Sequence, residues 1–397
     1  MTPNHRHVGG RFPSVSVTRT MVGLLSGFLF WLPSTATAGQ TSLALVSARD
    51  HIEGSMAAPQ SVYADETRIY LATAQLTNGT LFVLSRDRAA NFPVLESIPY
   101  PSPLFAVRGD AQNVYVTAGD GSLLVYRKDP QLTLVQTVPL ATHFLGSLAV
   151  TDDRVFVALE PSIRFAVDDG RVYLAALNEG ETVVELSKPA LTPVRTYGDA
   201  FEANTTVVFD RQTGARVAAI SASYGNLYEG GTFLFGTDPG CCGAGIFVHD
   251  ASSLALDQFI ARSWTNTVVR RDGLLIAGNE AGRVDAFDIV SNPSPLLATL
   301  DLRQLTGHTG NEDIEIRALW ADDFDNLIFA GSSWGNDQSR GPLLPSFFVL
   351  ASTSSASVSS TSLVFATQIL GTTSAPQSVT LTSTGSAIAR NPSIRPR

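Results

Sequence analysis

The sequence has 397 residues, of which 44% are hydrophobic and 16% are charged. A chain of this length and apolar content can bury a sizeable core, which excludes a protein that is disordered throughout. Its formal net charge is −9. A field of that sign repels nucleic acid and anionic membrane surfaces, so we expect neither as a partner.

The N-terminus, residues 1–38, has the organisation of a secretory signal peptide. Residues 1–20 are basic and contain no acid, 21–32 form an apolar run, and 36–38 supply small residues at the cleavage spacing. We expect cleavage before Gly39 and a secreted, periplasmic or cell-surface location. A retained anchor is the alternative, but about 12 apolar residues are too few to span a bilayer comfortably. No later segment reaches transmembrane length, so we expect no membrane-spanning segment after cleavage.

A turn pair followed by a short apolar strand recurs through the middle of the chain. Short strands separated by Gly, Asn, Asp and Pro are the signal of β-hairpins. A second apolar strand follows most copies, and a third usually comes after it. The five clear copies read RIYLAT (68–73), NVYVTA (113–118), RVFVAL (154–159), LLIAGN (274–279) and LIFAGS (327–332).

The spacing of these copies predicts a β-propeller, because a period of about 40 to 50 residues with four short strands is its signature. Gly230-Gly231 opens a sixth copy. The interval before it is twice as long, and we place one degenerate unit at 181–221. A further pair, Asp169-Gly170, lies too close behind the third copy to open a unit. The count is therefore seven blades, with six as the alternative.

We thus predict an all-β fold with the propeller over residues 39–351. A small sheet cannot bury both of its faces alone, whereas sheets stacked around an axis bury each other's faces and leave no long exposed edge. The last unit ends at 347–353 without a fourth strand. We expect the strand Ser42 to Asp50 to complete it and close the ring.

A change of composition follows the repeats. Residues 352–362 are nearly all Ser, Thr and Ala, which indicates a flexible linker. After it, LVFATQILGTTSAPQSVTLTSTGS (363–386) resembles the opening of a choice-of-anchor D (ASH/hydin-like) domain. That resemblance implies an immunoglobulin-like β fragment at 363–397. The match covers about two strands of a fold that normally has seven or more, so we expect a truncated domain.

Two stretches of the repeats resemble known propeller families. GNEAGRVDAFDIVSNPSPLLATLDL (278–302) is similar to the LVIVD class of repeat, with its Gly turn, apolar-Val-Asp strand and following Pro. VVFDRQTGARVAAI (207–220) resembles a pyrroloquinoline-quinone (PQQ)-like repeat, with a D-x-x-T-G turn. Both resemblances imply a propeller, and neither implies a particular activity.

Cys241 and Cys242 are adjacent in DPGCCGAG. In an oxidising compartment they can close a strained vicinal disulfide. Free or intermolecular thiols are an alternative. A cofactor-linked role is another, since quinone-dependent alcohol dehydrogenases, which are also propellers, carry such a pair beside the cofactor, although the Trp-rich repeats of that family are missing here. A metal site formed with His249 is a further alternative. Two thiolates and one His are fewer than the four ligands of a structural zinc site, so we expect no metal.

A second candidate is the connection before the last copy, TGHTGNEDIEIR. His308, Glu312, Asp313 and Glu315 lie there, and long propeller loops line the binding face. A His beside carboxylates can act as a general base or a metal ligand, while a polar loop that caps the sheet is the structural alternative. The acidic turn pairs, such as Asp168-Asp169, are interpreted as turns in which Asp accepts local backbone hydrogen bonds.

These features favour a secreted or surface-associated, non-catalytic binding or scaffold protein. Its partner is unknown, a protein or glycan ligand fits the expectation, and we expect a monomer. The alternative function is a propeller enzyme, either a quinone-dependent oxidoreductase or a metal-assisted hydrolase, with its site at the channel mouth. The sequence identifies no cofactor.

Overall fold

A computed structural model describes most of the repeat region and little of either end. The described residues are 42–50, 52, 57–160, 163–175, 182–198, 205–222, 224–238, 245–262, 264–271, 273–306, 314–321, 324, 327–334, 345–353, 356–358 and 381–383. The chain divides into a compact unit, Leu43–Ser352, and a second unit formed by Met1–Ser42 with Thr353–Arg397. The predicted signal peptide lies outside the described residues.

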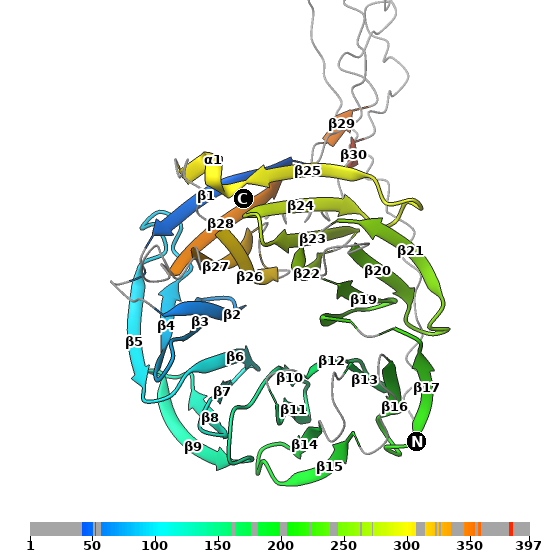
Figure 1. The fold of residues 1–397 in the computed structure, drawn as a ribbon. Coiled ribbons are helices and arrows are strands. Elements are labelled where there is room, and N and C mark those ends of the chain that lie inside the picture. Colours follow the sequence, from blue (N-terminus) through cyan, green and yellow to red (C-terminus); the bar gives the residue numbers. More distant parts are fainter. Residues whose placement is uncertain are drawn as a thin grey trace, which may run out of the picture. The chain divides into compact units, whose positions relative to one another are not determined.

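The larger unit is a ring of seven four-stranded sheets (Figure 1), which confirms the prediction of an all-β, seven-bladed propeller. In each blade the strands are given from the channel outward. Blade 1 consists of β2 (Ala58–Ala64), β3 (Arg68–Ala74), β4 (Gly79–Ser85) and β5 (Val94–Tyr100), and blade 2 of β6 (Leu104–Gly109), β7 (Asn113–Ala118), β8 (Ser122–Arg127) and β9 (Thr133–Pro139). Blade 5 consists of β18 (Asn226–Gly230), β19 (Phe233–Asp238), β20 (Gly245–Asp250) and β21 (Leu256–Ala261), and blade 6 of β22 (Thr265–Arg271), β23 (Leu274–Asn279), β24 (Arg283–Asp288) and β25 (Leu296–Asp301).

Blades 3 and 4 are interleaved along the chain. Blade 3 consists of β10 (Leu148–Val150), β11 (Arg154–Ala158), β14 (Val183–Ser187) and β15 (Pro193–Tyr197), and blade 4 of β12 (Arg164–Val167), β13 (Arg171–Ala175), β16 (Thr206–Asp210) and β17 (Arg216–Ile220). The chain therefore makes the inner half of blade 3, then the inner half of blade 4, and returns to complete each in turn.

Interleaving corrects two predictions about this region. Asp169-Gly170 does open a blade, because the strand after it, β13, pairs with β12 and β16. The unit predicted at 181–221 is not one blade, since β14 pairs with β11 and β16 pairs with β13. The expected number of blades was right because the two errors compensate.

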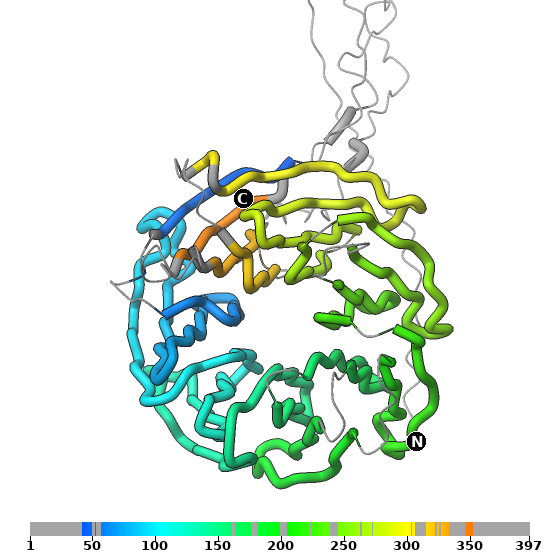
Figure 2. The backbone as a smooth tube through the Cα atoms, in the orientation of Figure 1, coloured from blue at the N-terminus to red at the C-terminus, as the bar shows by residue number. Residues whose placement is uncertain are grey.

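The seventh blade joins the two ends of the ring. Its order is β26 (Ile314–Ala321), β27 (Leu327–Trp334), β28 (Pro345–Thr353) and β1 (Ser42–Asp50). In Figure 2 the blue and orange ends of the coloured chain lie together at this blade. The predicted closure by the N-terminal strand is confirmed.

The hydrophobic core is divided into seven clusters, each between two consecutive blades. In β3, Ile69 and Leu71 pack toward blade 7, whereas Tyr70 and Ala72 pack toward blade 2. All four side chains are buried. Because successive residues of a strand point to opposite faces, an almost continuous apolar run is what a sheet buried on both faces requires. Each blade is thus stable only between its neighbours.

In four blades, a Lys or Arg side chain at an equivalent position contacts an aromatic ring of the preceding blade. The residue after the third strand of a blade lies over an aromatic side chain of the preceding blade, at distances of 5.3 to 5.8 Å. Cation–π contacts of this length are favourable, by about 0.5–2 kcal/mol according to burial. The four pairs are Arg86 with Phe329, Lys128 with Tyr70, Lys188 with Tyr115, and Arg211 with Phe156.

Aspartates shape the turns before the second strands. Asp65 Oδ1 accepts hydrogen bonds from the backbone amides of Thr67 and Arg68, both 2.9 Å, and the Tyr70 hydroxyl donates to Asp65 Oδ2. The same arrangement recurs at Asp110 with Tyr115 and at Asp168 with Tyr173. This geometry agrees with the interpretation of the Asp168-Asp169 pair as a turn.

The other described elements are short. Helix α1 (Leu302–Thr306) follows β25, and β29 (Ala356–Val358) pairs antiparallel with β30 (Leu381–Ser383) in the smaller unit. β29 falls within the predicted linker, 352–362. Among the described residues, no helix has both the length and the apolar composition needed to cross a membrane.

Candidate functional site: the polar channel of the ring

All seven innermost strands contribute to one cavity of about 440 Å³. These strands are β2, β6, β10, β12, β18, β22 and β26, and they surround the centre of the ring in Figure 1. The inner strands carry amide, hydroxyl and charged side chains among their apolar ones. The side chains that matter most for the chemistry are Arg108, Arg164, Asn226, Asn266, Glu315 and Arg317.

A chain of hydrogen bonds connects four blades along the channel wall. Arg164 Nε on β12 donates to Asn226 Oδ1 on β18, at 2.8 Å. Asn226 Nδ2 donates in turn to the backbone oxygen of Asn266 on β22, at 2.7 Å. Asn266 Nδ2 donates to Glu315 Oε1 on β26, at 2.9 Å. The partners of Asn226 and Asn266 are a guanidinium, which can only donate, and oxygens, which can only accept, so the orientation of both side-chain amides is determined.

Glu315 ends this chain in an ion pair. Its second oxygen, Oε2, accepts from Arg317 Nε at 2.9 Å and lies 2.7 Å from Arg317 Nη2. Both side chains are 30% exposed. Two nitrogens of the Arg317 guanidinium thus share one carboxylate oxygen, and the other oxygen is bonded to Asn266.

Arg108 projects from β6 on another part of the wall. Its Nη1 donates to Ser61 Oγ at 3.0 Å and to the backbone oxygen of Val107 at 2.7 Å. The guanidinium lies 5.4 Å from the ring centre of Trp320 on β26. Burial lowers the pKa of this guanidinium, because the surrounding groups solvate its charge less well than water does.

Tyr228 on β18 interacts electrostatically with both Arg108 and Arg164. Its hydroxyl donates to the backbone oxygen of Asn266 at 3.1 Å. Burial raises the pKa of Tyr228, and the hydroxyl of Thr267 and the positive charges of Arg164 and Arg108 act in the opposite direction. The phenol thus lies within the field of both guanidinium groups, although they belong to blades 2 and 4.

Of the residues predicted for the binding-face loop, only Glu315 lies within the described residues. It belongs to an inner strand and to the channel wall instead of a loop. His308, Glu312 and Asp313 lie outside the described residues, as do Cys241 and Cys242. The role proposed for each of these five residues stays a prediction.

His249 is buried in blade 5, and both of its ring nitrogens are in hydrogen bonds. Nδ1 lies 3.1 Å from the backbone oxygen of Leu254, to which it must donate, so Nε2 accepts from the Tyr224 hydroxyl at 2.5 Å. Burial lowers the pKa of His249. The described ranges contain no group of three or more His, Cys, Asp or Glu side chains that could hold a metal ion.

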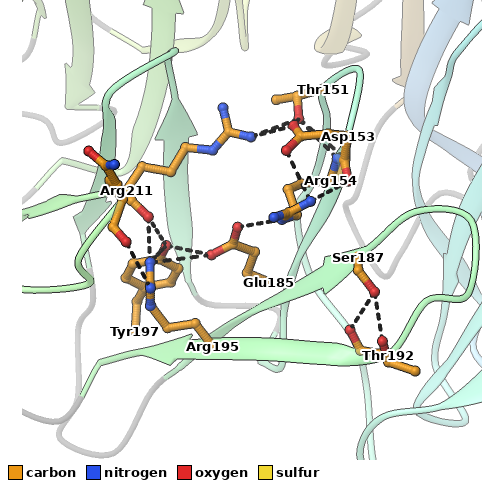
Figure 3. A network of polar contacts seen from close by, with 10 residues as sticks. Thr151, Asp153, Arg154, Glu185, Ser187, Thr192, Arg195, Tyr197 and Arg211 are labelled. Carbon is orange, nitrogen blue, oxygen red and sulfur yellow. Dashed lines mark hydrogen bonds and ion pairs between the residues drawn. The ribbon is translucent and has the colours of Figure 1, made fainter.

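A second polar network lies between blades 3 and 4 (Figure 3). The carboxylate of Glu185 on β14 is only 4% exposed and accepts from Arg154 Nε at 3.0 Å and from the Tyr197 hydroxyl at 2.7 Å. Arg211, which follows β16, donates to Asp153 Oδ1 at 2.7 Å. Arg195 Nη1 donates to the backbone oxygen of Arg211. The contacts of Arg211 connect blades 3 and 4, whereas those of Glu185 lie within blade 3. None of these residues lines the channel cavity.

The prediction from sequence missed most of the channel because its residues come from seven separate strands. A signal was present: charged or amide side chains lie a few residues before several of the turn pairs, within otherwise apolar strands. Arg108 precedes the turn at Asp110, Arg164 the turn at Asp168, and Asn226 the turn at Gly230.

Comparison with known proteins supports the fold. No family model matches the sequence, and no curated protein matches it. Among solved structures, the chain is similar to the crystal structure of the computationally designed Ika8 protein. The TM-score is 0.50 at 15% identity, over 74% of this chain and 98% of that chain. A likeness at this level of identity concerns the fold alone.

Proposed function

We propose that this protein is a secreted or surface-associated, non-catalytic β-propeller that binds a small polar ligand, or a polar group of a protein or glycan, in its central channel. The observation that carries the proposal is the hydrogen-bonded wall from Arg164 to Glu315. Its donors and acceptors are held by neighbouring blades, so binding does not have to order them, and less conformational entropy is lost. A volume of about 440 Å³ falls in the range of small-molecule sites.

The proposed location rests on residues 1–38, which have the three regions of a signal peptide. Expression of the full chain in a host with a secretory pathway tests it. We expect an exported form whose N-terminal residue is Gly39. A full-length product retained inside the cell would contradict this part of the proposal.

The binding proposal is tested with a variant that fills the channel. Gln60 lies on the channel wall and its side chain makes a local hydrogen bond to the backbone oxygen of Ala58. Gln60→Trp should therefore obstruct the cavity with little effect on the blade. The matched control is Gln212→Trp, at an exposed turn on blade 4.

We expect that thermal-shift screening of sugars, amino acids and dicarboxylic acids yields ligands that raise the Tm of the wild type and of Gln212→Trp. The same ligands should not raise the Tm of Gln60→Trp. Equal binding by Gln60→Trp would exclude the channel as the site. Turnover of a substrate by the purified protein, with a bound quinone chromophore or stoichiometric Ca²⁺, would support the enzymatic alternative.

A further inference from the structure

The charge of the channel is opposite in sign to that of the whole chain. Three arginines and one glutamate are the charged side chains of the described cavity wall, whereas the chain carries a formal net charge of −9. A cleft with one sign of charge and low-dielectric walls concentrates ions of the opposite sign. The channel wall should therefore attract small anions even though the protein as a whole is acidic.

The single glutamate does not neutralise this excess. Both Glu315 oxygens are in hydrogen bonds, one with Asn266 and the other with Arg317. Its negative charge is thus already paired with Arg317, at 2.7 Å between Oε2 and Nη2. Arg108 has no such carboxylate partner among the described residues.

Arg108 is held by neutral groups within the described part of the chain. The groups around it are the Ser61 hydroxyl, backbone oxygens and the face of Trp320. A guanidinium removed from water in this way loses solvation, as the lowered pKa of Arg108 indicates. An anion placed against it would restore a charged partner. Arginine also presents a planar fork of donors that matches carboxylate and phosphate oxygens.

We infer that the ligand of the channel carries an oxyanion, a carboxylate or a phosphate, that binds against Arg108 with Arg164 and Tyr228 nearby. This inference rests on the proposed binding function and specifies its chemistry. The cavity of about 440 Å³ accommodates a small organic acid. The net negative charge of the chain, −9, repels polyanions such as nucleic acid, so the site favours small anions over large ones.

Isothermal titration calorimetry on the wild-type full chain tests the inference with three probes. Succinate and inorganic phosphate supply the two oxyanions, and succinamide is the neutral analogue of succinate with nearly the same shape. We expect at least one of the two anions to bind with a Kd of about 1 mM or tighter, and the comparison between them identifies the preferred oxyanion. Succinamide should bind at least about tenfold more weakly than succinate if the carboxylate is the group recognised, because a charge-assisted hydrogen bond is lost.

Variants at Arg108 locate the site. Arg108→Gln should weaken binding of the preferred anion by about tenfold or more, the usual effect of losing a hydrogen bond to a charged group. Arg108→Lys keeps the charge but loses the planar fork of donors, so it should bind more weakly than the wild type and more tightly than Arg108→Gln. The control is Arg127→Gln, which removes an exposed arginine from β8, the third strand of the same blade, and should leave the affinity unchanged. Circular dichroism and the Tm of each variant verify that it is folded.

The outcomes separate this inference from the proposed function. If neither anion binds to the wild type, or if succinamide binds as tightly as succinate while phosphate does not bind, the inference is overturned. Neutral ligands that bind the wild type but not Gln60→Trp would nevertheless uphold the proposed function. Anion binding that is unaffected in both folded Arg108→Gln and Gln60→Trp would place the anion outside the channel and overturn the inference.

Discussion

Blades 1 and 2 and blades 3 and 4 make the same inter-blade contact in two different ways. Lys128 of blade 2 pairs with Asp65 of blade 1 at 2.8 Å, and the two side chains are only 8% and 18% exposed. Arg211 of blade 4 pairs with Asp153 of blade 3 at 2.7 Å, but Asp153 is 59% exposed. Each cation also lies over an aromatic side chain of the earlier blade.

The difference indicates that two features hold neighbouring blades together, namely the passages of the chain between the sheets and the ion pairs between their side chains. Blades 1 and 2 are each formed from one continuous segment, so the chain passes between them only once, from β5 to β6, and side-chain contacts hold their faces together. In blades 3 and 4 the chain crosses between the sheets three times, so neither can detach without displacing the other. A buried ion pair is therefore less important there, and the buried carboxylate of Glu185 lies inside blade 3 instead.

The largest expected effect comes from removing a buried aromatic ring in each region. Phe156→Ala in blade 3 and Phe82→Ala in blade 1 should each lower the free energy of unfolding by about 4 kcal/mol, because both side chains are completely or almost completely buried. Denaturant unfolding measures the two losses. Hydrogen exchange should show lost amide protection in blades 3 and 4 together for Phe156→Ala. A loss confined to blade 3 would show that interleaving does not couple the two sheets.

A smaller effect is expected from the buried carboxylate of the interleaved region. Glu185→Ala removes the partner of Arg154 and Tyr197. Because Arg154 can still reach water, we expect a loss of about 2 kcal/mol, less than for a fully buried pair. Urea unfolding provides the measurement, and Glu66→Ala, at an exposed turn of blade 1, is the control. A loss no larger than that of the control would mean that this network contributes little to the stability of blade 3.

Substitution of the two inter-blade cations, Lys128 and Arg211, tests this comparison directly. Lys128→Met should cost about 1–2 kcal/mol, since it leaves a mostly buried Asp65 without its partner. Arg211→Met should cost about 0–1 kcal/mol, as is usual for pairs with an exposed member. Double-mutant cycles with Asp65→Asn and Asp153→Asn isolate the pair energies. Equal coupling energies at the two sites would refute the idea that the chain crossing replaces the ion pair.

The smallest effect is a pH dependence of the same contact. Burial would raise the pKa of Asp65, but Lys128 and the backbone amides of Thr67 and Arg68 outweigh it, so its pKa is lowered. The same holds for Asp110, with Lys188. The stability contributed by these carboxylates is complete above the unfolded pKa of about 3.9 and is lost as the pH falls through the lower folded value.

We therefore expect the stability difference between the wild type and the double variant Asp65→Asn/Asp110→Asn to be constant near neutral pH. It should shrink as the pH falls below about 4. Thermal unfolding over a pH series follows this difference. Asp169→Asn, at an exposed turn position, serves as the control and should show no such change. A difference that stays constant down to the lowest pH would contradict the assigned role of the lysines.

The repeat was predictable because each strand carries its own local signals. Turn pairs such as Asp65-Glu66 mark the hairpins, and strands such as 68–73 are apolar throughout because both faces are buried. Strand pairing was less predictable. VVELS of β14 and TVVFD of β16 are alike in length and apolarity, so nothing local states which sheet each one joins. The interleaving follows from tertiary contacts that strand periodicity does not encode.

The channel was harder to predict than the blades, since its residues are brought together only by ring closure. Glu315 was identified because it lies beside other acidic residues, and it was placed in a loop. Lys128 and Lys188 are the only two lysines of the sequence, and they occupy equivalent positions after β8 and β14. Aligning the repeats on the third strand instead of the turn would have revealed both contacts.

The pairing order of the seventh blade has a consequence for how the protein is made. β1 is the first described strand to be synthesised. Its partner β28 follows about 300 residues later, which takes some tens of seconds at about 5–20 residues per second. Until β28 has been synthesised, β1 lacks the strand with which it pairs in the seventh blade. The ring therefore cannot close before the segment Pro345–Thr353 has been synthesised.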